Sequence, residues 1–340
     1  MVEVRVDEAT GGWNVLAPRR AARPDESRTP GSSPAAGSSP GPTACPFCWG
    51  SEAMTPPEVL RVPAGAPDWR VRVVPNLYAA VDPPGDTVRA PAPTPESPAP
   101  FTGRHEVLVE SGRHDWDLRR GDPDEVATIL FAMRERCRAL AAEGPAAISV
   151  FRNYGARAGA SLVHPHSQIV ALDQAPPGLL DRWRRAREYH DRTGTCLHDA
   201  VAAAERRAGE RIVLDLGEVL VFQDRAGSVP HQTTLMPAQR AAGLGDASDQ
   251  ILTVLAGTLP RVLAGLAAVL DDPAYNLVVH AGPVGDPAAE DWYRWHLTIY
   301  PRVTTVGGLE IATGVAVNPS TPEQTAGALR AEIAGRPAAG

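Results

Sequence analysis

The segment over residues 159–170 constrains the fold of this chain more than any other. It reads Gly-Ala-Ser-Leu-Val-His-Pro-His-Ser-Gln-Ile-Val, and its side chains alternate in the manner of a β-strand. Because every second side chain points to the same face, we expect His164, His166 and Gln168 to share one face of a rigid strand. An imidazole is a capable nucleophile near neutral pH and a good zinc ligand, so this pattern predicts a reaction site.

Length and composition narrow the class of protein. The 340 residues suffice for two domains or for one duplicated domain, and the net charge of −7 argues against a general nucleic-acid binder. No apolar run approaches the roughly 20 residues that span a bilayer, and the charged start of the chain does not resemble a signal peptide. Four cysteines are too few for a disulfide scaffold of this size. We therefore expect a cytoplasmic protein without nucleic-acid or membrane partners.

The two halves of the chain show the same order of predicted elements. Each runs from strands to a helix, and then through an asparagine-bearing strand to a histidine-bearing strand. Asn153 and the pair His164 and His166 occupy these last two strands in the first half, and Asn276 and His296 occupy them in the second. Thr298 stands where a further histidine would fall, so we predict an ancient duplication with a degenerate second site.

The pattern of turns, caps and apolar residues predicts the elements themselves. Strands are expected over residues 70–75, 105–110, 147–153, 212–222, 231–236, 275–280 and 295–300. Helices are expected between Asp122 and Gly144, over 179–192, over 250–270, and after Thr321, where the sequence Thr-Pro-Glu-Gln resembles a capping box.

Cys45 and Cys48 form a Cys-x-x-Cys pair, which indicates either half of a zinc site or a redox pair. A redox pair of the thioredoxin type lies between a strand and a helix, whereas this pair follows a segment rich in Pro, Ser and Gly. The context therefore favours zinc. A structural zinc ion takes four nitrogen or sulfur ligands, and His114 and His164 are the candidates for the other two.

Together these motifs resemble the galactose-1-phosphate uridylyltransferase family, which belongs to the histidine-triad superfamily. The resembling segments are residues 17–24, 45–48, 74–80, 106–114, 153–155, 158–168, 295–302 and 308–310. The resemblance implies an α+β fold, namely a duplicated histidine-triad-like fold with antiparallel sheets flanked by helices. It implies a first domain over residues 1–175, with the zinc site and the nucleophile, and a degenerate second domain over 176–340.

The resemblance also implies an enzyme of galactose metabolism that moves UMP from UDP-glucose to a hexose-1-phosphate, with galactose-1-phosphate expected. His166 would attack the α-phosphorus and carry the nucleotide covalently, while Gln168 and Ser161 would donate hydrogen bonds to phosphate oxygens. The expected nucleotide and phosphate ligands are Arg20, Arg23, Asn76 and Asn153. The expected zinc ligands are Cys45, Cys48, His114 and His164. A homodimer is expected, in which the second half, with Glu310, completes the site of the other chain.

Several positions depart from the family pattern. Ser167 stands where the best-known uridylyltransferases carry glycine and where ADP-glucose phosphorylases carry serine. The other departures are Leu309 for a tyrosine, Thr304 for a sugar-phosphate lysine, and Arg182 and Thr298 for ligands of a second metal, which we therefore do not expect.

Three hypotheses about function stay open. The first is nucleotidyl transfer between sugar phosphates. The second is an ADP-sugar or dinucleoside-polyphosphate phosphorylase, or a hydrolase, that uses the same histidine. The third is a non-enzymatic, zinc-stabilised nucleotide-binding protein, against which the intact His164, His166 and Gln168 count.

Overall fold

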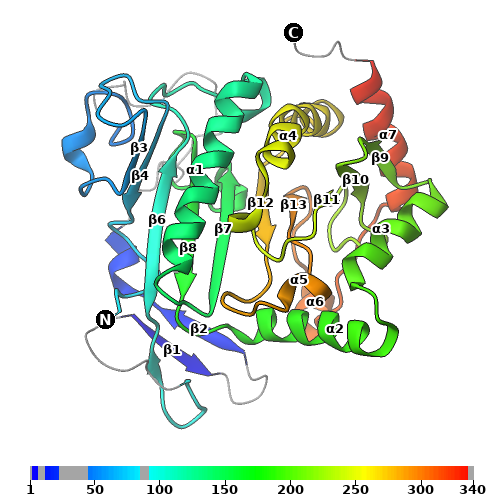
Figure 1. The fold of residues 1–340 in the computed structure, drawn as a ribbon, viewed down its shortest axis with the longest axis horizontal. Coiled ribbons are helices and arrows are strands. Elements are labelled where there is room, and N and C mark those ends of the chain that lie inside the picture. Colours follow the sequence, from blue (N-terminus) through cyan, green and yellow to red (C-terminus); the bar gives the residue numbers. More distant parts are fainter. Residues whose placement is uncertain (1, 7–11, 23–44, 85–91, 336–340) are drawn as a thin grey trace.

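The structure is a computed structural model that describes residues 2–6, 12–22, 45–84 and 92–335. Within these residues, a ten-stranded antiparallel sheet runs through both halves of the chain (Figure 1). From one edge its first five strands are β3 (Leu60–Val62), β4 (Val71–Pro75), β6 (Gly103–Val109), β8 (His166–Leu172) and β7 (Ala147–Tyr154). The next five are β12 (Tyr275–His280), β13 (His296–Pro301), β11 (Thr233–Pro237), β10 (Val219–Gln223) and β9 (Ile212–Asp215).

The two sets of five strands meet where β7 pairs with β12. Counted outwards from this seam, each set visits its strands in the same order of the chain, which supports the predicted duplication. Asn153 and Asn276 are direct partners across the seam. Because one sheet and one hydrophobic core continue across it, the domain boundary at residue 175 stays a prediction.

Two long helices, α1 (Pro123–Ala141) and α4 (Asp249–Leu270), contact each other and cover one face of the sheet (Figure 1). Helix α1 begins after Asp122, as predicted. The Asp122 side chain accepts the Asp124 N–H, and the Glu125 side chain accepts the Asp122 N–H, which forms a capping box. Leu130 of α1 and Leu255 of α4 pack with Ile169 of β8 in the same core. These contacts anchor the strand that carries the predicted nucleophile.

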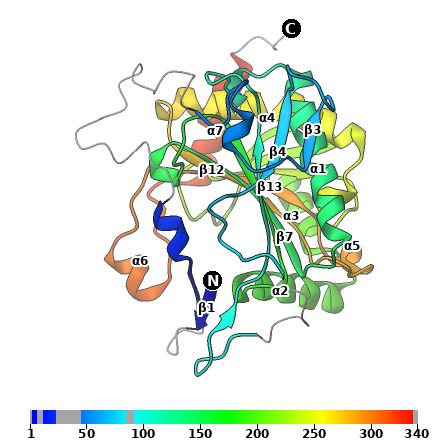
Figure 2. The ribbon, with the colours of Figure 1, turned by 90° about the vertical axis from the view of Figure 1, so that its left-hand side faces the viewer.

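The remaining helices are α2 (Pro177–Thr193), α3 (Leu197–Ala208), α5 (Ala289–Trp292), α6 (Gly308–Thr313) and α7 (Pro322–Ala334). Short 3-10 turns lie at Pro18–Ala22 (η1), Glu52–Met54 (η4), Leu118–Arg120 (η5), Ala156–Ala158 (η6) and Leu244–Asp246 (η7). A small sheet joins β2 (Trp13–Leu16), β1 (Glu3–Val6) and β5 (Ala99–Pro100). Helix α6 projects from the rest of the protein (Figure 2).

Helix α4 bears on the expectation that no apolar segment is long enough to span a bilayer. Among the described helices it alone is long and apolar enough to do so, but 61% of its most apolar window is buried inside the protein. It packs against α1 and α7, as the core helix of a sheet protein does.

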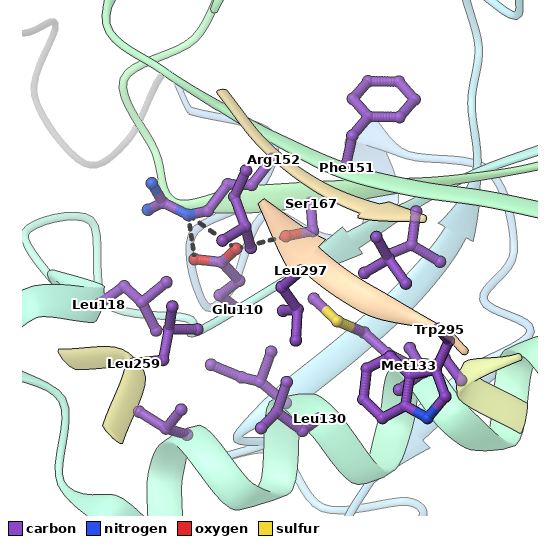
Figure 3. A pocket seen from close by; sticks show the side chains of 16 residues that line it. Glu110, Leu118, Leu130, Met133, Phe151, Arg152, Ser167, Leu259, Trp295 and Leu297 are labelled. Atoms are coloured by element: carbon purple, nitrogen blue, oxygen red, sulfur yellow. Dashed lines mark hydrogen bonds and ion pairs between the residues drawn. The ribbon is translucent and has the colours of Figure 1, made fainter. Parts of the chain in front are cut away.

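A cavity of about 20 Å³ remains between α1, α4 and the sheet. Its wall is apolar except where Glu110, Arg152 and Ser167 meet (Figure 3).

Two expectations about local structure are wrong, and one helix was missed. Strand β8 begins at His166, so His164 lies in the bend before the strand. Pro165 has no backbone N–H to give to a β-ladder, which explains why regular pairing starts after it. Helix α3 was not predicted, and the strand region predicted over 212–222 is the hairpin of β9 and β10. Thr321 lies at the N-cap of α7, but its side chain makes no capping hydrogen bond, so no capping box forms.

Candidate active site and metal centre

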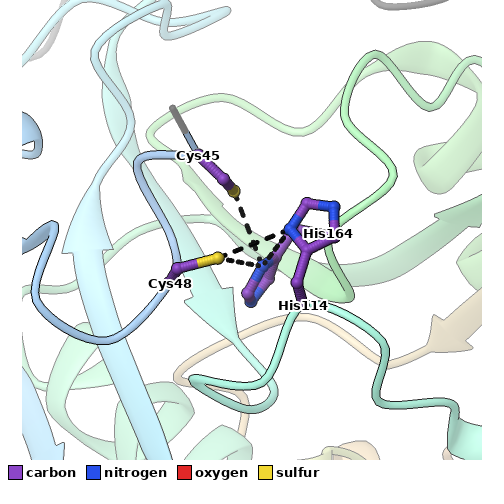
Figure 4. Close-up of side chains that lie close together, drawn as sticks. All are labelled: Cys45, Cys48, His114 and His164. Carbon is purple, nitrogen blue, oxygen red and sulfur yellow. Dashed lines mark hydrogen bonds between the residues drawn. The ribbon is translucent and has the colours of Figure 1, made fainter. Parts of the chain in front are cut away.

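Cys45, Cys48, His114 and His164 converge from three separate segments of the chain (Figure 4). Their ligand atoms all lie within 4.8 Å of one another. The two histidine Nδ1 atoms are 3.3 Å apart, and Cys48 Sγ lies 3.4 Å from His114 Nδ1 and 3.6 Å from His164 Nδ1. Cys45 Sγ lies 3.5 Å from His164 Nδ1. A tetrahedral zinc ion with ordinary bond lengths has N–N edges of about 3.3 Å and N–S edges of about 3.5 Å. The predicted Cys2His2 cluster is therefore present, and its dimensions fit zinc.

The residues around the cluster set the orientation and the protonation state of its ligands. His164 Nε2 lies 2.7 Å from the Ser111 carbonyl oxygen and donates its proton there, which turns the Nδ1 lone pair toward the two cysteines. Burial lowers the pKa of His164 to about 4, so the imidazole is neutral, as a ligand must be. Burial also raises the pKa of Cys45 to about 12, so the thiol stays protonated in this pocket unless a cation replaces its proton.

His166 is the first residue of β8 and lies half-buried beside the cluster. Its Nδ1 lies 2.8 Å from the His164 carbonyl oxygen, so Nδ1 carries the proton and Nε2 carries the lone pair. The Phe47 ring, from the Cys-x-x-Cys loop, contacts both histidines, with centroids 5.5 Å from His166 and 5.9 Å from His164. The cluster and the predicted nucleophile therefore form one packed unit.

Gln168 and Asn76 both lie against His105, a residue that no sequence motif indicated. The Ala80 N–H donates to His105 Nδ1 over 3.0 Å, so the proton of the neutral ring is on Nε2. His105 Nε2 donates to Gln168 Oε1 over 2.9 Å. Asn76 lies against the same ring edge, and its side-chain oxygen accepts the Tyr78 N–H over 2.8 Å. The side-chain oxygen of Gln168 accepts the His105 proton, so the amide nitrogen of Gln168 points its N–H groups away from His105.

The other predicted residues occupy different places. Arg20 Nη1 donates to the Tyr78 carbonyl oxygen over 2.6 Å, which ties η1 to the segment that carries Asn76. Asn153 Oδ1 accepts from Asn276 Nδ2 over 2.7 Å at the seam of the sheet.

Ser161 and Glu310, two further predicted residues, lie in different parts of the structure. Ser161 is buried in the bend before His164. Glu310 lies on the projecting α6, where its carboxylate accepts the Gly307 N–H. Arg23 lies outside the described residues.

In the second half, His296 repeats the arrangement of His166. It begins its strand, and its Nδ1 lies 3.0 Å from the Arg294 carbonyl oxygen, two residues back. Its ring, however, packs 5.0 Å from His198 and 4.9 Å from His280. Burial lowers the pKa of His296 to about 4 and that of His280 to about 2. His198 comes from α3, the helix that the sequence did not reveal.

The family model described as galactose-1-phosphate uridyl transferase, N-terminal domain, matches residues 1–176. An ADP-glucose phosphorylase from Arabidopsis thaliana is 32% identical over 334 residues, which are 96% of this chain and 92% of the relative. A galactose-1-phosphate uridylyltransferase from Haemophilus influenzae is 26% identical, over 94% of this chain and 91% of the relative.

A solved structure of the Arabidopsis thaliana ADP-glucose phosphorylase with bound ADP-glucose has the same fold. Its TM-score is 0.76 at 30% identity, and the match covers 97% of this chain and 99% of the other. These matches confirm the α+β fold and support the two enzyme hypotheses over a non-enzymatic binding protein. With the model match over half the chain and a 32% identical relative over nearly all of it, this chain belongs to the galactose-1-phosphate uridyl transferase family.

Proposed function

We propose that this enzyme moves a nucleotidyl group from a nucleoside-diphosphate glucose to a phosphate-bearing acceptor, through a covalent nucleotidyl-histidine at His166. The observation that carries the proposal is the anchoring of His166. Its Nδ1 proton is held by the His164 carbonyl, so Nε2 has the lone pair that a nucleophile needs. Covalent catalysis divides one difficult displacement at phosphorus into two easier ones.

In the first step, the Nε2 lone pair of His166 forms a bond to the α-phosphorus of the donor. The bond from that phosphorus to the bridging oxygen breaks, and glucose-1-phosphate leaves with the electron pair. In the second step, an oxygen of the acceptor attacks the same phosphorus, and the electron pair of the N–P bond returns to His166. The His164 carbonyl stabilises the charge on the ring while the nucleotide is attached.

Gln168 and Ser161 are proposed to donate hydrogen bonds to the phosphate oxygens as charge shifts among them. The contact from His105 supports this role for Gln168, because it leaves the amide N–H groups as donors. Arg20 and Asn76 lie on segments that are tied together, and with Arg23 and Asn153 they are proposed to hold the nucleotide.

The metal is proposed to be zinc, with Cys45, Cys48, His114 and His164 as its ligands. Four protein ligands leave no open position for substrate, so zinc would act structurally, as a rigid link between the three segments. The proposal rests on the tetrahedral spacing of the four ligand atoms.

Two pairs of donor and acceptor substrates are candidates for this enzyme. The sequence favours UDP-glucose with galactose-1-phosphate. The second candidate is ADP-glucose with phosphate, and two observations support it. The phosphorylase relative is 32% identical over 96% of the chain, against 26% for the Haemophilus influenzae uridylyltransferase. Ser167 is the residue expected of the phosphorylases. A cytoplasmic location is proposed from the sequence alone.

A homodimer is proposed from the surface of the projecting segment around α6. Leu309, Ile311 and Val315 are 59%, 77% and 61% exposed, which is unusual for apolar side chains so close together. A second copy of the chain would cover them, and would bring Glu310 to its partner's site. Mixing inactive His166→Ala and Glu310→Ala chains should then restore part of the activity as subunits exchange. An active monomer in light scattering would contradict the dimer.

The proposed function is tested by incubating the zinc-loaded protein with UDP-glucose or ADP-glucose, each labelled in the nucleotide and without acceptor. We expect label on the protein from one donor and no label on His166→Ala. Adding galactose-1-phosphate or phosphate to the labelled protein then identifies the acceptor, because only the right acceptor releases the label. Equal labelling of wild-type protein and His166→Ala would refute the mechanism.

A further inference from the structure

Glu110 contacts both neighbours of His166. Its backbone N–H donates to the Pro165 carbonyl oxygen over 3.1 Å. Its carboxylate accepts the Ser167 hydroxyl over 2.7 Å (Figure 3). Val109, the residue before it, is the cross-strand partner of His166 in the β6–β8 pairing. One residue therefore holds the backbone on either side of the proposed nucleophile.

The carboxylate of Glu110 is itself held by a buried ion pair. Arg152 Nε lies 3.0 Å from both oxygens, and Arg152 Nη1 donates to the Tyr275 hydroxyl over 2.8 Å. The side chains of Glu110 and Arg152 are 0% and 4% exposed. Tyr275 belongs to β12, so the chain of contacts runs from beneath His166 to the second half of the sheet.

In the second half of the sheet, the residues that correspond to Ser167 and Arg152 are uncharged. His296 matches His166, because each begins its strand and donates its Nδ1 proton to the carbonyl two residues back. Ser167, the next residue, pairs with Arg152 across β7–β8. Its counterpart Leu297 pairs with Val279 across β12–β13, and both are buried.

In the second half of the sheet, Leu297 and Val279 thus occupy the positions that Ser167 and Arg152 occupy in the first half. An apolar pair stands there in place of a hydroxyl and a charged side chain. Buried ion pairs can often be replaced by apolar side chains without loss of stability. Folding alone therefore does not explain the polar group beneath His166.

We infer that Glu110 and Ser167 are positioning residues that hold His166 for attack on phosphorus, and that Arg152 and Tyr275 fix Glu110 in turn. The inference rests on the proposed function of His166. Attack needs the reacting atoms about 3 to 3.5 Å apart and aligned, and a misplacement of about 1 Å can cost on the order of 100-fold in rate. The hydroxyl of Ser167 restrains the backbone directly after His166, where a shift would move the nucleophile.

The test compares the rate of covalent nucleotidylation in single-turnover reactions with donor affinity and with Tm. Ser167→Ala removes the hydroxyl alone. We expect nucleotidylation to slow by about 10-fold or more, since even part of such a misplacement is costly, while donor affinity and zinc content stay unchanged. Ser167→Thr keeps the hydroxyl and should recover most of the rate.

Thr258→Val is the matched control. It removes another buried hydroxyl, which bonds to the Val254 carbonyl within α4 and has no link to His166. It should change Tm as much as Ser167→Ala does and leave the rate of nucleotidylation unchanged. Glu110→Gln is a second probe. It keeps the shape of the side chain but removes its charge, and it should slow nucleotidylation more than Ser167→Ala.

The outcomes separate this inference from the proposed function. Normal nucleotidylation by Ser167→Ala and Glu110→Gln, with an inactive His166→Ala, would overturn the positioning role and keep the nucleophile. Loss of Tm and rate together in Ser167→Ala, without recovery in Ser167→Thr, would show a structural role only. Nucleotidylation of His166→Ala would overturn the proposed function itself.

Discussion

The buried histidines of the second half should make the stability of this protein depend on pH in a measurable way. Burial is the main cause that lowers the pKa of His296 to about 4, and the nearby Arg182 lowers it further. An unfolded histidine has a pKa of about 6.5. Between these two values the unfolded chain binds a proton that the folded protein does not bind. The free energy of unfolding must therefore decrease as the pH falls from 6.5 toward 4.

The size of the effect follows from the pKa difference. Each pKa unit corresponds to about 1.36 kcal/mol, so His296 should cost the folded state about 2 kcal/mol between pH 7 and pH 5, and about 3 kcal/mol by pH 4. His296→Asn places an amide N–H where the ring offers its Nδ1 proton to the Arg294 carbonyl, but it cannot titrate.

Urea unfolding of both proteins at pH 7 and pH 5, with the same free zinc concentration, measures the difference. Groups distant from His296 contribute equally to both proteins and cancel. His198 and His280 stay neutral in both folded proteins, because burial is the main cause that lowers their pKa values. We expect wild-type protein to lose about 2 kcal/mol more than His296→Asn over this range. An equal loss in both proteins would mean that His296 is protonated or solvated in the folded state, which would refute the reasoning.

Three further predictions concern the first half and the surface. Cys48→Ser should abolish the bound zinc in elemental analysis and lower Tm in calorimetry, because structural zinc stabilises small peptides by on the order of 10 kcal/mol; an unchanged zinc content would contradict the site. His105→Ala should lower kcat because it frees Gln168 to rotate, and raise the donor KM because it also removes the acceptor of the Ala80 N–H beside Asn76; an unchanged kcat would exclude the first role. Leu309→Glu combined with Ile311→Glu should give monomers in analytical ultracentrifugation, and a persistent dimer would place the interface elsewhere.

The sequence revealed the parts of the site that short motifs carry. The Cys-x-x-Cys spacing and the alternating histidines predict the metal cluster and the nucleophile, because the relevant side chains lie two or three residues apart. His105 and Glu110 were missed because their roles depend on the pairing of β6 with β8, and Arg152 because its role depends on the pairing of β7 with β8. Such contacts depend on strand order, which no local pattern specifies.

In the fold, too, local features could be predicted from the sequence and long-range contacts could not. Helix α1 was predicted closely because Asp122 and an apolar stripe mark it, whereas the single sheet that joins both halves could not be read from the sequence. His198 was missed for a similar reason, because helix α3 brings it beside His296 only in the folded protein.

The central claim is that His166 carries the nucleotide covalently, and the most direct test is to find the nucleotide on that residue. The protein would be reacted with the labelling donor, without acceptor, and digested at neutral pH, since a phosphoramidate is labile to acid. Tandem mass spectrometry should find one nucleotidyl group, on the peptide that contains residues 164–168, at His166. A nucleotidyl group on another residue, or a protein that turns over its substrates without any adduct, would contradict the account.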